Sequence, residues 1–389
     1  MSMKYLSREI EPLIKRAAGQ FPVLVLTGPR QTGKSTLLKK LFPGHRYVSL
    51  DDLQLRAAAR RDPALFIASN PTPVIIDEIQ YAPVLLSHIK ISVDSANGAK
   101  GQFMLTGSQM FPLMAGVSES LAGRAALFEL LGFSWKELKP VPKTPRDCFA
   151  AVLRGFYPVP ALRKVDLRQY YSGYTATYLE RDIRQIQSVQ DMSVFQTFLQ
   201  LLAARAGALL NLTEVSKECG ITLLTARRWL SLLENTRIIY LLRPYARNIT
   251  KRLVKSPKLY FTDTGLLAYL LRYPDFETLM AGPQAGAFFE NMIVAEALKR
   301  KFNRGLLYEL YFYRDSNGNE ADLVFDFGRR QVFAEIKASK NPSEKFAGFS
   351  KHIPLNGQTA YLLSFYEKEL FLSKSVKAVP WWAFDPSAI

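Results

Sequence analysis

A chain of 389 residues is too long for one ordinary core and predicts two or three domains. Its content of 48% hydrophobic and 12% aromatic residues excludes a disordered protein. The formal charge of +17 is large, and residues 151–272 carry 18 lysines and arginines but only 8 acidic residues. Such a basic block usually indicates an anionic partner, most often nucleic acid, although a general solubility charge would look the same.

The cysteines and histidines further limit the class of protein that the sequence predicts. Cys148 and Cys219 lie far apart in the sequence, which fits a reducing compartment without structural disulfides. Three scattered histidines and the lack of a CxxC pair argue against a zinc site. The first residues lack the apolar stretch of a signal peptide, and no run of 18 apolar residues occurs. We therefore expect a soluble, cytoplasmic protein with no membrane partner.

The first segment, residues 1–145, alternates short apolar runs with helical stretches. This pattern is typical of an α/β fold with a parallel sheet covered on both faces. A helix from Lys34 to Phe42 follows a glycine-rich turn, and the proline-rich stretch Lys139–Pro145 is interpreted as a linker. Strands are predicted at Phe21–Thr27, Arg46–Leu50, Pro73–Ile76 and Gln102–Thr106.

The middle segment, residues 146–275, is mainly helical and predicts a winged helix. A helix at Leu212–Cys219 is separated by a tight turn from a second helix, Leu223–Glu234, which Thr222 caps. Two β-like stretches follow, at Ile238–Arg243 and Lys258–Phe261. In a winged helix the second helix contacts DNA.

That second helix divides into two expected faces. The polar face would contact phosphates and base edges, and the basic stretch Tyr245–Lys258 would follow a phosphate backbone. The alternative is a winged helix that contacts another protein, with charges that only solvate it. The expected exposed residues are Thr222, Thr225, Arg227 and Arg228, and the expected apolar ones are Leu224, Trp229, Leu232 and Leu233.

The sequence GPRQTGKS at Gly28–Ser35 matches the phosphate-binding loop pattern GxxxxGK[ST] at every fixed position, between a predicted strand and helix. Its two glycines allow backbone angles that point successive amides at a phosphate. Lys34 would place its charge near the β- and γ-phosphates, and Ser35 would offer a hydroxyl to Mg²⁺. The expected ATP-binding residues are Gly28, Pro29, Arg30, Gln31, Thr32, Gly33, Lys34, Ser35 and Thr36.

The sequence VIIDE at Val74–Glu78 supplies the second half of a nucleotide site. Asp77 ends an apolar strand and is placed to bind the nucleotide and to hold the Mg²⁺ shell. Glu78 is placed to orient and deprotonate the attacking water. An acidic pair that ends a strand is common, but downstream of a phosphate-binding loop it predicts hydrolysis of ATP, with Ser35 and Asp77 at the metal and Lys34 and Glu78 catalytic.

Two further residues are candidates for catalysis. The strand FMLTGS ends in Thr106 and Ser108, and a polar residue there would lie between the two motifs and sense the γ-phosphate. Arg124, in ESLAGRAALFEL, would reach a phosphate of its own chain or of a neighbouring subunit, as arginine fingers do. The alternative for Arg124 is a surface arginine.

The third segment, residues 280–389, contains a helix followed by alternating strands. Asp322 precedes Glu335 and Lys337 in the arrangement D…ExK of restriction-endonuclease-like nucleases, and strand alternation puts Glu335 and Lys337 on one face. The carboxylates of Asp322 and Glu335 would share a metal ion while Lys337 steadies the water, and Glu290 on the preceding helix would add a ligand. The alternative is a structural network of ion pairs.

The stretches GPRQTGKSTLL, SLDD, VIIDEIQ, LTGSQ and SLAGR, in this order, resemble a prokaryotic family of AAA-type P-loop ATPases. TYLERDI, SPKLYFTDTGL and the C-terminal acidic cluster are similar to that family's partner domain of unknown function, so that the whole chain looks AAA_14/DUF4143-like. The resemblance implies an AAA+-like ATPase core that uses ATP and Mg²⁺, and a homo-oligomer in which a neighbour completes the site.

The sequence therefore predicts three parts: an AAA+-like ATPase domain (1–145), a winged-helix domain (146–275) and a restriction-endonuclease-like α/β domain (280–389). ATP hydrolysis would change how the two distal parts sit on DNA, which the last part would then cut. Two alternatives remain open. In one the protein is an ATP-driven switch or scaffold that grips DNA without cutting it, and in the other its partner is a protein.

Overall fold

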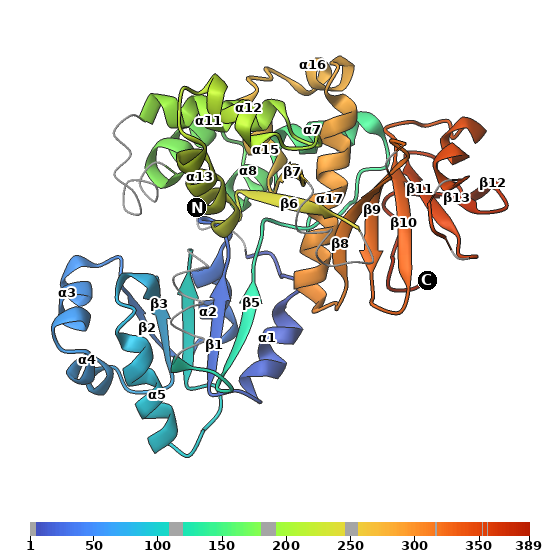
Figure 1. The fold of residues 1–389 in the computed structure, drawn as a ribbon. Coiled ribbons are helices and arrows are strands. Elements are labelled where there is room, and N and C mark those ends of the chain that lie inside the picture. The colour runs from blue at the N-terminus through green and yellow to red at the C-terminus, as the bar shows by residue number, and fades with distance from the viewer. Residues whose placement is uncertain are drawn as a thin grey trace. The chain divides into compact units, whose positions relative to one another are not determined.

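The computed structural model describes residues 5–108, 120–179, 192–245, 256–315, 317–351, 353–355 and 357–389. The chain forms two compact units. Unit 1 consists of Met1–Phe133 with two short later pieces, Asn235–Arg237 and Phe302–Gly305. Unit 2 consists of Ser134–Glu234, Ile238–Lys301 and Leu306–Ile389. Figure 1 follows the chain through both units by colour.

Unit 1 is built on a parallel sheet with the strand order β2-β3-β4-β1-β5. The four strands expected from the apolar runs are present, and a fifth, which the sequence did not suggest, follows them. Its sequence AALFE is only partly buried, so it lacks the apolar run that marks the others. The strands are β1 (Val23–Thr27), β2 (Arg46–Ser49), β3 (Val74–Asp77), β4 (Phe103–Gly107) and β5 (Ala125–Glu129).

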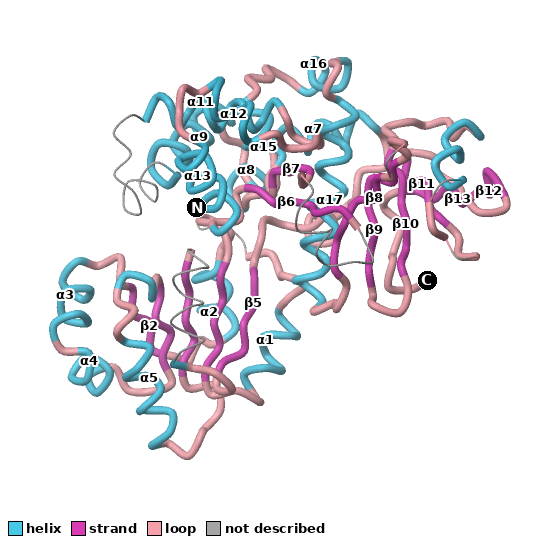
Figure 2. Tube along the Cα trace, viewed as in Figure 1, coloured by secondary structure: helices cyan, strands magenta, loops and turns pink. Residues whose placement is uncertain are grey.

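Alternation along the strands of unit 1 separates two hydrophobic layers. Val23 and Val25 of β1 pack in one cluster with side chains of α3, α4 and α5, whereas Leu24 and Leu26 pack in another with α1 and α2. Helices therefore cover both faces of the sheet, as Figure 2 shows in cyan and magenta. The helices are α1 (Glu11–Ala18), α2 (Lys34–Leu41), α3 (Leu53–Arg61), α4 (Pro63–Ser69), the 3₁₀ turn η1 (Ile79–Tyr81) and α5 (Leu85–Ser95).

The helices of unit 2 begin inside the predicted linker. Pro145 is the first residue of α7, and the hydroxyl of Thr144 accepts the amide of Asp147 as its cap, so the proline-rich stretch ends in a helix start. Among the described residues no helix is both long and apolar enough to cross a membrane. The helices are α7 (Pro145–Arg154), α8 (Pro158–Leu162), α9 (Leu167–Tyr174), the π-helical turn η2 (Thr175–Leu179), α11 (Met192–Ala204), α12 (Leu212–Glu218), α13 (Leu223–Asn235), α15 (Thr264–Leu270), α16 (Phe276–Ala281) and α17 (Ala285–Arg304).

Unit 2 also contains a mixed sheet with the order β12-β13-β11-β10-β9-β8-β6-β7. Strands β8, β9 and β10 form an antiparallel meander, and β11 pairs in parallel with β10 after the 3₁₀ helix η3 (Glu344–Lys351). The strands are β6 (Ile239–Pro244), β7 (Lys258–Phe261), β8 (Glu309–Arg314), β9 (Glu320–Asp326), β10 (Gln331–Ile336), β11 (Ala360–Ser364), β12 (Leu370–Ser373) and β13 (Val376–Pro380).

The pairing of β6 with β8 joins the middle and third segments of the sequence into one unit. Arg243 and Pro244 lie opposite Tyr311 and Phe312, and the amide of Tyr245 donates to the carbonyl of Phe312 at 2.6 Å. The two predicted β-like stretches are therefore the paired strands β6 and β7 at the edge of the C-terminal sheet. This backbone pairing is why the chain has two compact units where the sequence suggested three segments.

The stretch SPKLYFTDTGL forms β7 and the start of α15, and its side chains fix the core of unit 2. Asp263 caps α15 through the amide of Leu266 at 2.9 Å, and the same carboxylate accepts the amide of Phe156 at 2.7 Å and the Tyr171 hydroxyl at 2.9 Å. A Cβ at Gly265 would lie 2.2 Å from that hydroxyl, so only glycine fits. Three separate segments meet at this one aspartate.

Candidate nucleotide site and C-terminal charge cluster

The carboxyl ends of β1, β3 and β4 bring the expected nucleotide motifs together. The phosphate-binding loop follows β1, and Asp77 and Glu78 follow β3. Strand β4 pairs with both neighbours and therefore places Thr106 and Ser108 between the two motifs. Ligands of open parallel sheets bind at this edge.

The glycines of the loop have backbone conformations that other residues resist. Gly28 has φ 137°, and a Cβ there would lie 2.1 Å from the carbonyl oxygen of Leu130. Gly33, with φ 90°, lies directly before the first residue of α2. The amides at the start of α2 have no partner within the helix, so this end of the helix suits a phosphate. Thr36 is exposed on the first turn.

Lys34 is buried and closes the loop on itself. Its ammonium donates to the carbonyls of Gly28 at 2.9 Å and Pro29 at 2.8 Å, and the hydroxyl of Thr32 donates to Pro29 at 3.0 Å. These are the bonds that a nucleotide phosphate would replace for Lys34. The residues present therefore fit a phosphate group.

Arg8 fixes this loop from outside the motif, and sequence reasoning missed it. Its buried guanidinium donates to the carbonyls of Thr32 at 3.0 Å and Leu131 at 2.9 Å, and it lies 4.6 Å from the ring centroid of Phe133. Nothing in the local sequence LSREIEP indicates that Arg8 would contact the phosphate-binding loop. Its role depends on contacts with the loop and with the segment after β5.

The carboxylate of Asp77 is the centre of the half of the site that was expected to bind Mg²⁺. Ser35 Oγ lies 2.8 Å from both carboxylate oxygens of Asp77, and the hydroxyl of Thr106 also donates to it. A third hydroxyl, that of Tyr47 on β2, donates at 2.6 Å. An aspartate and a serine side by side are the oxygen donors that Mg²⁺ takes in P-loop ATPases, so the donor set fits that ion.

Glu78 lies beside Asp77 with a left-handed backbone, φ 58°, which is uncommon for a residue with a side chain. Its amide donates to Thr106 Oγ1 at 3.1 Å. Its carboxylate accepts the side-chain amide of Gln80, which also donates to Ser108 Oγ at 3.1 Å. Gln80 lies two residues after Glu78 in the motif VIIDEIQ. This position in the motif was the sequence feature that could have identified Gln80 as a site residue.

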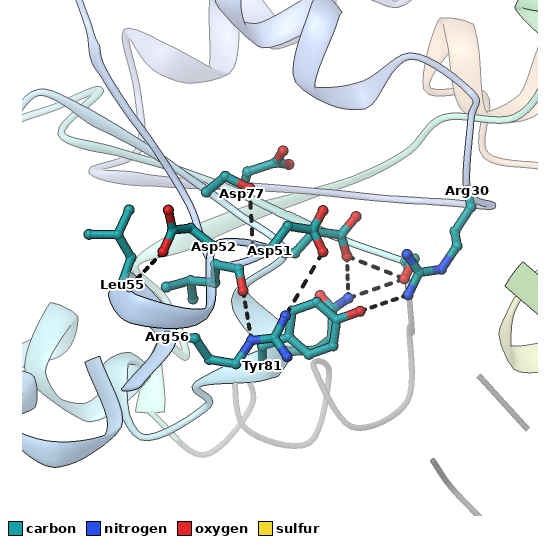
Figure 3. A network of polar contacts seen from close by, with 12 residues as sticks. Arg30, Asp51, Asp52, Leu55, Arg56, Asp77 and Tyr81 are labelled. Atoms are coloured by element: carbon teal, nitrogen blue, oxygen red, sulfur yellow. Dashed lines mark hydrogen bonds and ion pairs between the residues drawn. The ribbon is translucent and has the colours of Figure 1, made fainter. Parts of the chain in front are cut away.

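Arg30 of the loop is held by a tyrosine of the next motif. Its guanidinium donates to the hydroxyl of Tyr81 at 2.9 Å, and the guanidinium carbon of Arg56 on α3 lies 3.8 Å from the centroid of that ring. Arg60 donates to the backbone carbonyl of Tyr81 at 2.7 Å. Figure 3 shows Tyr81 between Arg56 and Arg30, which links the loop to helix α3.

The structure places Arg124 away from the phosphate loop of its own chain. Its carbonyl accepts the amide of Val23, so it lies at the amino end of the sheet, about 16 Å along the strand from Gly28, where the loop begins, at a rise of about 3.3 Å per residue. Its guanidinium pairs with Asp94 at 2.6 Å on the surface. The expectation that it reaches a phosphate of the same chain is therefore wrong, and a role in a neighbouring subunit stays a prediction.

The C-terminal acidic residues come together around lysines. Strand β9 carries Asp322 beside β10, where the amide of Ile336 donates to its carboxylate at 2.9 Å. Lys337 Nζ lies 2.6 Å from Glu335 Oε1 and 3.9 Å from Asp322. The alternation that was expected to put Glu335 and Lys337 on one face is present.

A second lysine, Lys258 of β7, lies among the carboxylates that were expected to bind a metal. Its ammonium is 3.0 Å from Glu290 Oε1 and 3.5 Å from Asp322 Oδ1, and it also pairs with Glu320. Its side chain is only 6% exposed. The sequence predicted that Lys258 belongs to a DNA-binding stretch. The structure instead buries its side chain among these carboxylates, because β7 is part of the C-terminal sheet.

The pKa values of this cluster follow from burial and crowding. Burial and the Asp322 charge raise the pKa of Glu290 to about 7, and the same two causes raise that of Glu335 to about 7. Burial lowers the pKa of Lys258, but the charges of Glu290, Asp322 and Glu320 outweigh it, so the net pKa is raised. Lys258 therefore stays charged, as a cation held by carboxylates.

Two lysines occupy positions beside the predicted metal ligands, and the metal site stays a prediction. In the described part of the chain, no group of three or more His, Cys, Asp or Glu side chains is arranged to hold a metal ion. The ammonium groups of Lys258 and Lys337 instead form ion pairs with Glu290, Asp322 and Glu335. The physical reason is that an ammonium within 3.5 Å of two carboxylates already supplies the positive charge.

Comparison with known proteins assigns the family. Residues 20–139 match an AAA domain, 146–277 a domain of unknown function (DUF8612) and 285–384 a domain of unknown function (DUF4143). Two proteins described as uncharacterized, from Mycobacterium bovis and Mycobacterium tuberculosis, are each 32% identical to this chain over 380 residues, 96% of it and 83% of their own length. The chain belongs to their family. This chain is an AAA-type P-loop ATPase with a C-terminal DUF4143 domain, and the AAA match spans the loop, Asp77 and Glu78.

Solved structures are similar at low identity. The Walker-type ATPase of Pyrococcus abyssi aligns with a TM-score of 0.45 and 15% identity over 68% of this chain and 95% of its own. The Holliday junction branch migration motor of Thermotoga maritima aligns with a TM-score of 0.29 and 16% identity over 60% of this chain and 86% of its own. The family assignment depends on the AAA match and the mycobacterial relatives. Because residues 285–384 match only a domain of unknown function, the resemblance to nucleases stays a prediction.

Proposed function

We propose that this protein is a Mg²⁺-dependent ATPase of the AAA+ type that acts as an ATP-driven switch on DNA, which it binds without cutting. The observation that carries the ATPase is the pair of 2.8 Å contacts from Ser35 Oγ to the carboxylate of Asp77. These contacts join the end of β3 to the first turn of α2, beside buried Lys34.

Each residue of the site has a distinct task in hydrolysis. The amides of the loop and the ammonium of Lys34 bind the phosphates, and Ser35 and Asp77 would hold the magnesium ion. That ion, when bound, supplies neutralisation of the phosphate charge. Glu78 accepts the proton of the attacking water. Ser108 and Gln80 hold the Glu78 carboxylate until the nucleotide is in place.

The DNA-binding proposal is supported by helix α13. Its exposed side chains lie three and four residues apart on one face, and a short turn joins it to α12. The antiparallel pair β6–β7 follows, and Leu209 before α12 bridges to Lys258 of β7, as in a winged helix. The basic residues of 246–255 lie outside the described residues. The exposed face consists of Leu224, Arg227, Arg228 and Ser231.

One residue of that helix corrects the expected division of its faces. Leu224 was expected on the apolar side with Trp229, but it is 58% exposed. Trp229, Leu232 and Leu233 are buried, as expected. Leu224 lies three and four residues before Arg227 and Arg228, which puts it on their side of the helix. An exposed leucine there suits contact with a base edge or a partner protein.

The C-terminal cluster favours binding over cleavage. Lys258 takes the central place among Glu290, Glu320 and Asp322, so its charge competes with any metal. Cleavage is kept as a second candidate because Asp322, Glu335 and Lys337 do meet in the D…ExK arrangement. Plasmid incubated with Mg²⁺ or Mn²⁺ and ATP should stay intact. Cleavage that Asp322→Ala abolishes would establish the second candidate instead.

The ATPase is tested by Lys34→Ala. We expect the rate of phosphate release to fall by about 100-fold or more, because the lysine contacts the phosphates in the transition state. Glu78→Gln should keep nucleotide binding and lose turnover. An Lys34→Ala variant that hydrolyses ATP at the wild-type rate would contradict the site.

DNA binding is tested by a double change, Arg227→Ala with Arg228→Ala. We expect weaker binding of duplex DNA, and a shallower decline of affinity with rising salt, because each lost phosphate contact lowers the slope. The matched control is Lys15→Ala with Arg16→Ala, an exposed basic pair on α1. Affinity that does not respond to salt would favour a protein partner.

A homo-oligomer is proposed as the setting in which Arg124 acts. In such an assembly Arg124 would leave Asp94 and reach the γ-phosphate of the neighbouring subunit. Sedimentation with and without ATP should show an assembly that forms with nucleotide. Mixing Arg124→Ala with Glu78→Gln subunits should then restore part of the ATPase activity, because mixed interfaces contain both residues. Monomers under all conditions would remove this role.

A further inference from the structure

The Asp77 carboxylate receives one hydroxyl that the recognised motifs do not supply. Ser35 belongs to the loop motif and Thr106 to the end of β4, but Tyr47 comes from β2. Its hydroxyl lies 2.6 Å from Asp77 Oδ2. The strand RYVS gave no sign of this role, because a tyrosine in a short strand is an ordinary packing residue.

The register of the sheet places Tyr47 where it can reach this carboxylate. Tyr47 lies opposite Ile75 on β3, and Asp77 is two residues further along, so all three side chains are on one face. Ile75 packs with residues of α2, so this is the face that the loop helix covers. The ammonium of Lys39 on α2 lies 4.1 Å from the centroid of the Tyr47 ring and fixes the ring from that side.

Exposure distinguishes Tyr47 from Thr106 and from the Asp77 carboxylate itself. Asp77 is 5% exposed and Thr106 is fully buried, whereas Tyr47 is 38% exposed. Removing the phenolic hydroxyl would therefore let water reach a carboxylate oxygen that is now hydrogen-bonded.

We propose that Tyr47 is a positioning residue for magnesium: its hydroxyl holds Asp77 in the orientation that receives the Mg²⁺ ion of Mg·ATP. The inference rests on the proposed Mg²⁺-dependent binding of ATP. Ser35 shares the carboxylate with Tyr47, so an Asp77 side chain that is free to rotate would also release the serine hydroxyl. Tyr47 thus acts through Asp77, without contact with the phosphates.

The test is a magnesium titration of nucleotide binding in Tyr47→Phe. Phenylalanine keeps the ring under Lys39 and removes only the hydroxyl. An ATP analogue with an N-methylanthraniloyl group reports binding by fluorescence. We expect the Mg²⁺ concentration for half-maximal binding to rise about 3- to 10-fold, in line with the loss of one hydrogen bond to a charged group at a partly exposed position. Binding without Mg²⁺ should stay unchanged.

The matched control is Tyr5→Phe in the same unit. It removes a tyrosine hydroxyl that donates to Glu11 at 2.8 Å and not to a residue of the nucleotide motifs. The control should titrate as the wild type. A Tyr47→Phe protein that also titrates as the wild type, or that only unfolds at lower temperature, would overturn the inference alone. A wild-type protein that binds the analogue without any response to Mg²⁺ would overturn the proposed function with it.

Discussion

The ammonium of Lys258 lies 3.0 Å from the carboxylate of Glu290, at the centre of a group of acidic side chains in unit 2. Glu290 also accepts the hydroxyl of Tyr260, two residues along β7 from Lys258. One strand therefore supplies both the cation and a hydroxyl to a glutamate on α17. This contact affects how the D…ExK residues are interpreted, because the lysine ammonium lies beside Glu290 and Asp322, where a metal ion was expected.

Lys258→Met should destabilise the protein by about 3–5 kcal/mol, because it leaves buried carboxylates without their cation. Denaturant unfolding measures the change. The matched control is Lys301→Met, whose partner Glu309 is exposed, and it should cost less than about 1 kcal/mol. Because the carboxylates then lack a cation, Mn²⁺ should stabilise Lys258→Met more than the wild type. Equal stability of the two variants would contradict the central role of Lys258.

The cluster should also make stability depend on pH. Glu290 and Glu335 have pKa values raised to about 7 in the folded protein, from 4.5. The folded state thus holds protons that the unfolded state releases, so their contribution is complete below about pH 4.5 and is lost as pH rises through about 7. Glu335→Gln should remove part of this loss, on the order of 2 kcal/mol between pH 5 and pH 8.

Urea unfolding of the wild type and Glu335→Gln at pH 5 and pH 8 measures this difference. Glu309→Gln, at an exposed glutamate, serves as the control and should leave the pH dependence of the wild type unchanged. If Glu335→Gln loses as much stability as the wild type between the two pH values, Glu335 does not take up a proton on folding.

Asp263→Asn should cost about 2–4 kcal/mol, because the amide cannot accept at both positions that now bind Phe156, Leu266 and Tyr171. Asp275→Asn is its control. Asp275 caps α16 through Thr278 alone at an exposed position, and asparagine caps nearly as well as aspartate, so the expected cost is below about 0.5 kcal/mol. Thermal unfolding compares the two. A similar loss in both variants would mean that Asp263 is only a helix cap.

Arg8→Lys should weaken nucleotide binding by about 5-fold or more, since one ammonium cannot reach the carbonyls of Thr32 and Leu131 together and a buried carbonyl loses its donor. Fluorescence of the bound ATP analogue measures the affinity. Arg16→Lys, on the exposed side of α1, should bind as the wild type. Unchanged affinity in Arg8→Lys would show that the loop keeps its shape without this residue.

The sequence by itself determined the nucleotide site as far as its residues are contiguous. Gly28, Gly33 and Lys34 follow a strand and begin a helix, and their chemistry is set by backbone conformations within eight residues. Asp77 and Glu78 end an apolar strand, and the parallel order of strands could be expected from the same runs. Local sequence patterns are sufficient to predict these features, because a phosphate-binding loop and a buried strand are each formed by contiguous residues.

The tertiary structure alone decided the residues whose partners are distant in the sequence. Tyr47 reaches Asp77 only through the register of β2 and β3, and Arg8 reaches Thr32 only through packing. The edge pairing of β6 with β8 brings Lys258 into the acidic cluster, and the position of Arg124 follows from β5 pairing with β1. Such contacts depend on which strands pair and in which register, and no motif in the sequence encodes that choice.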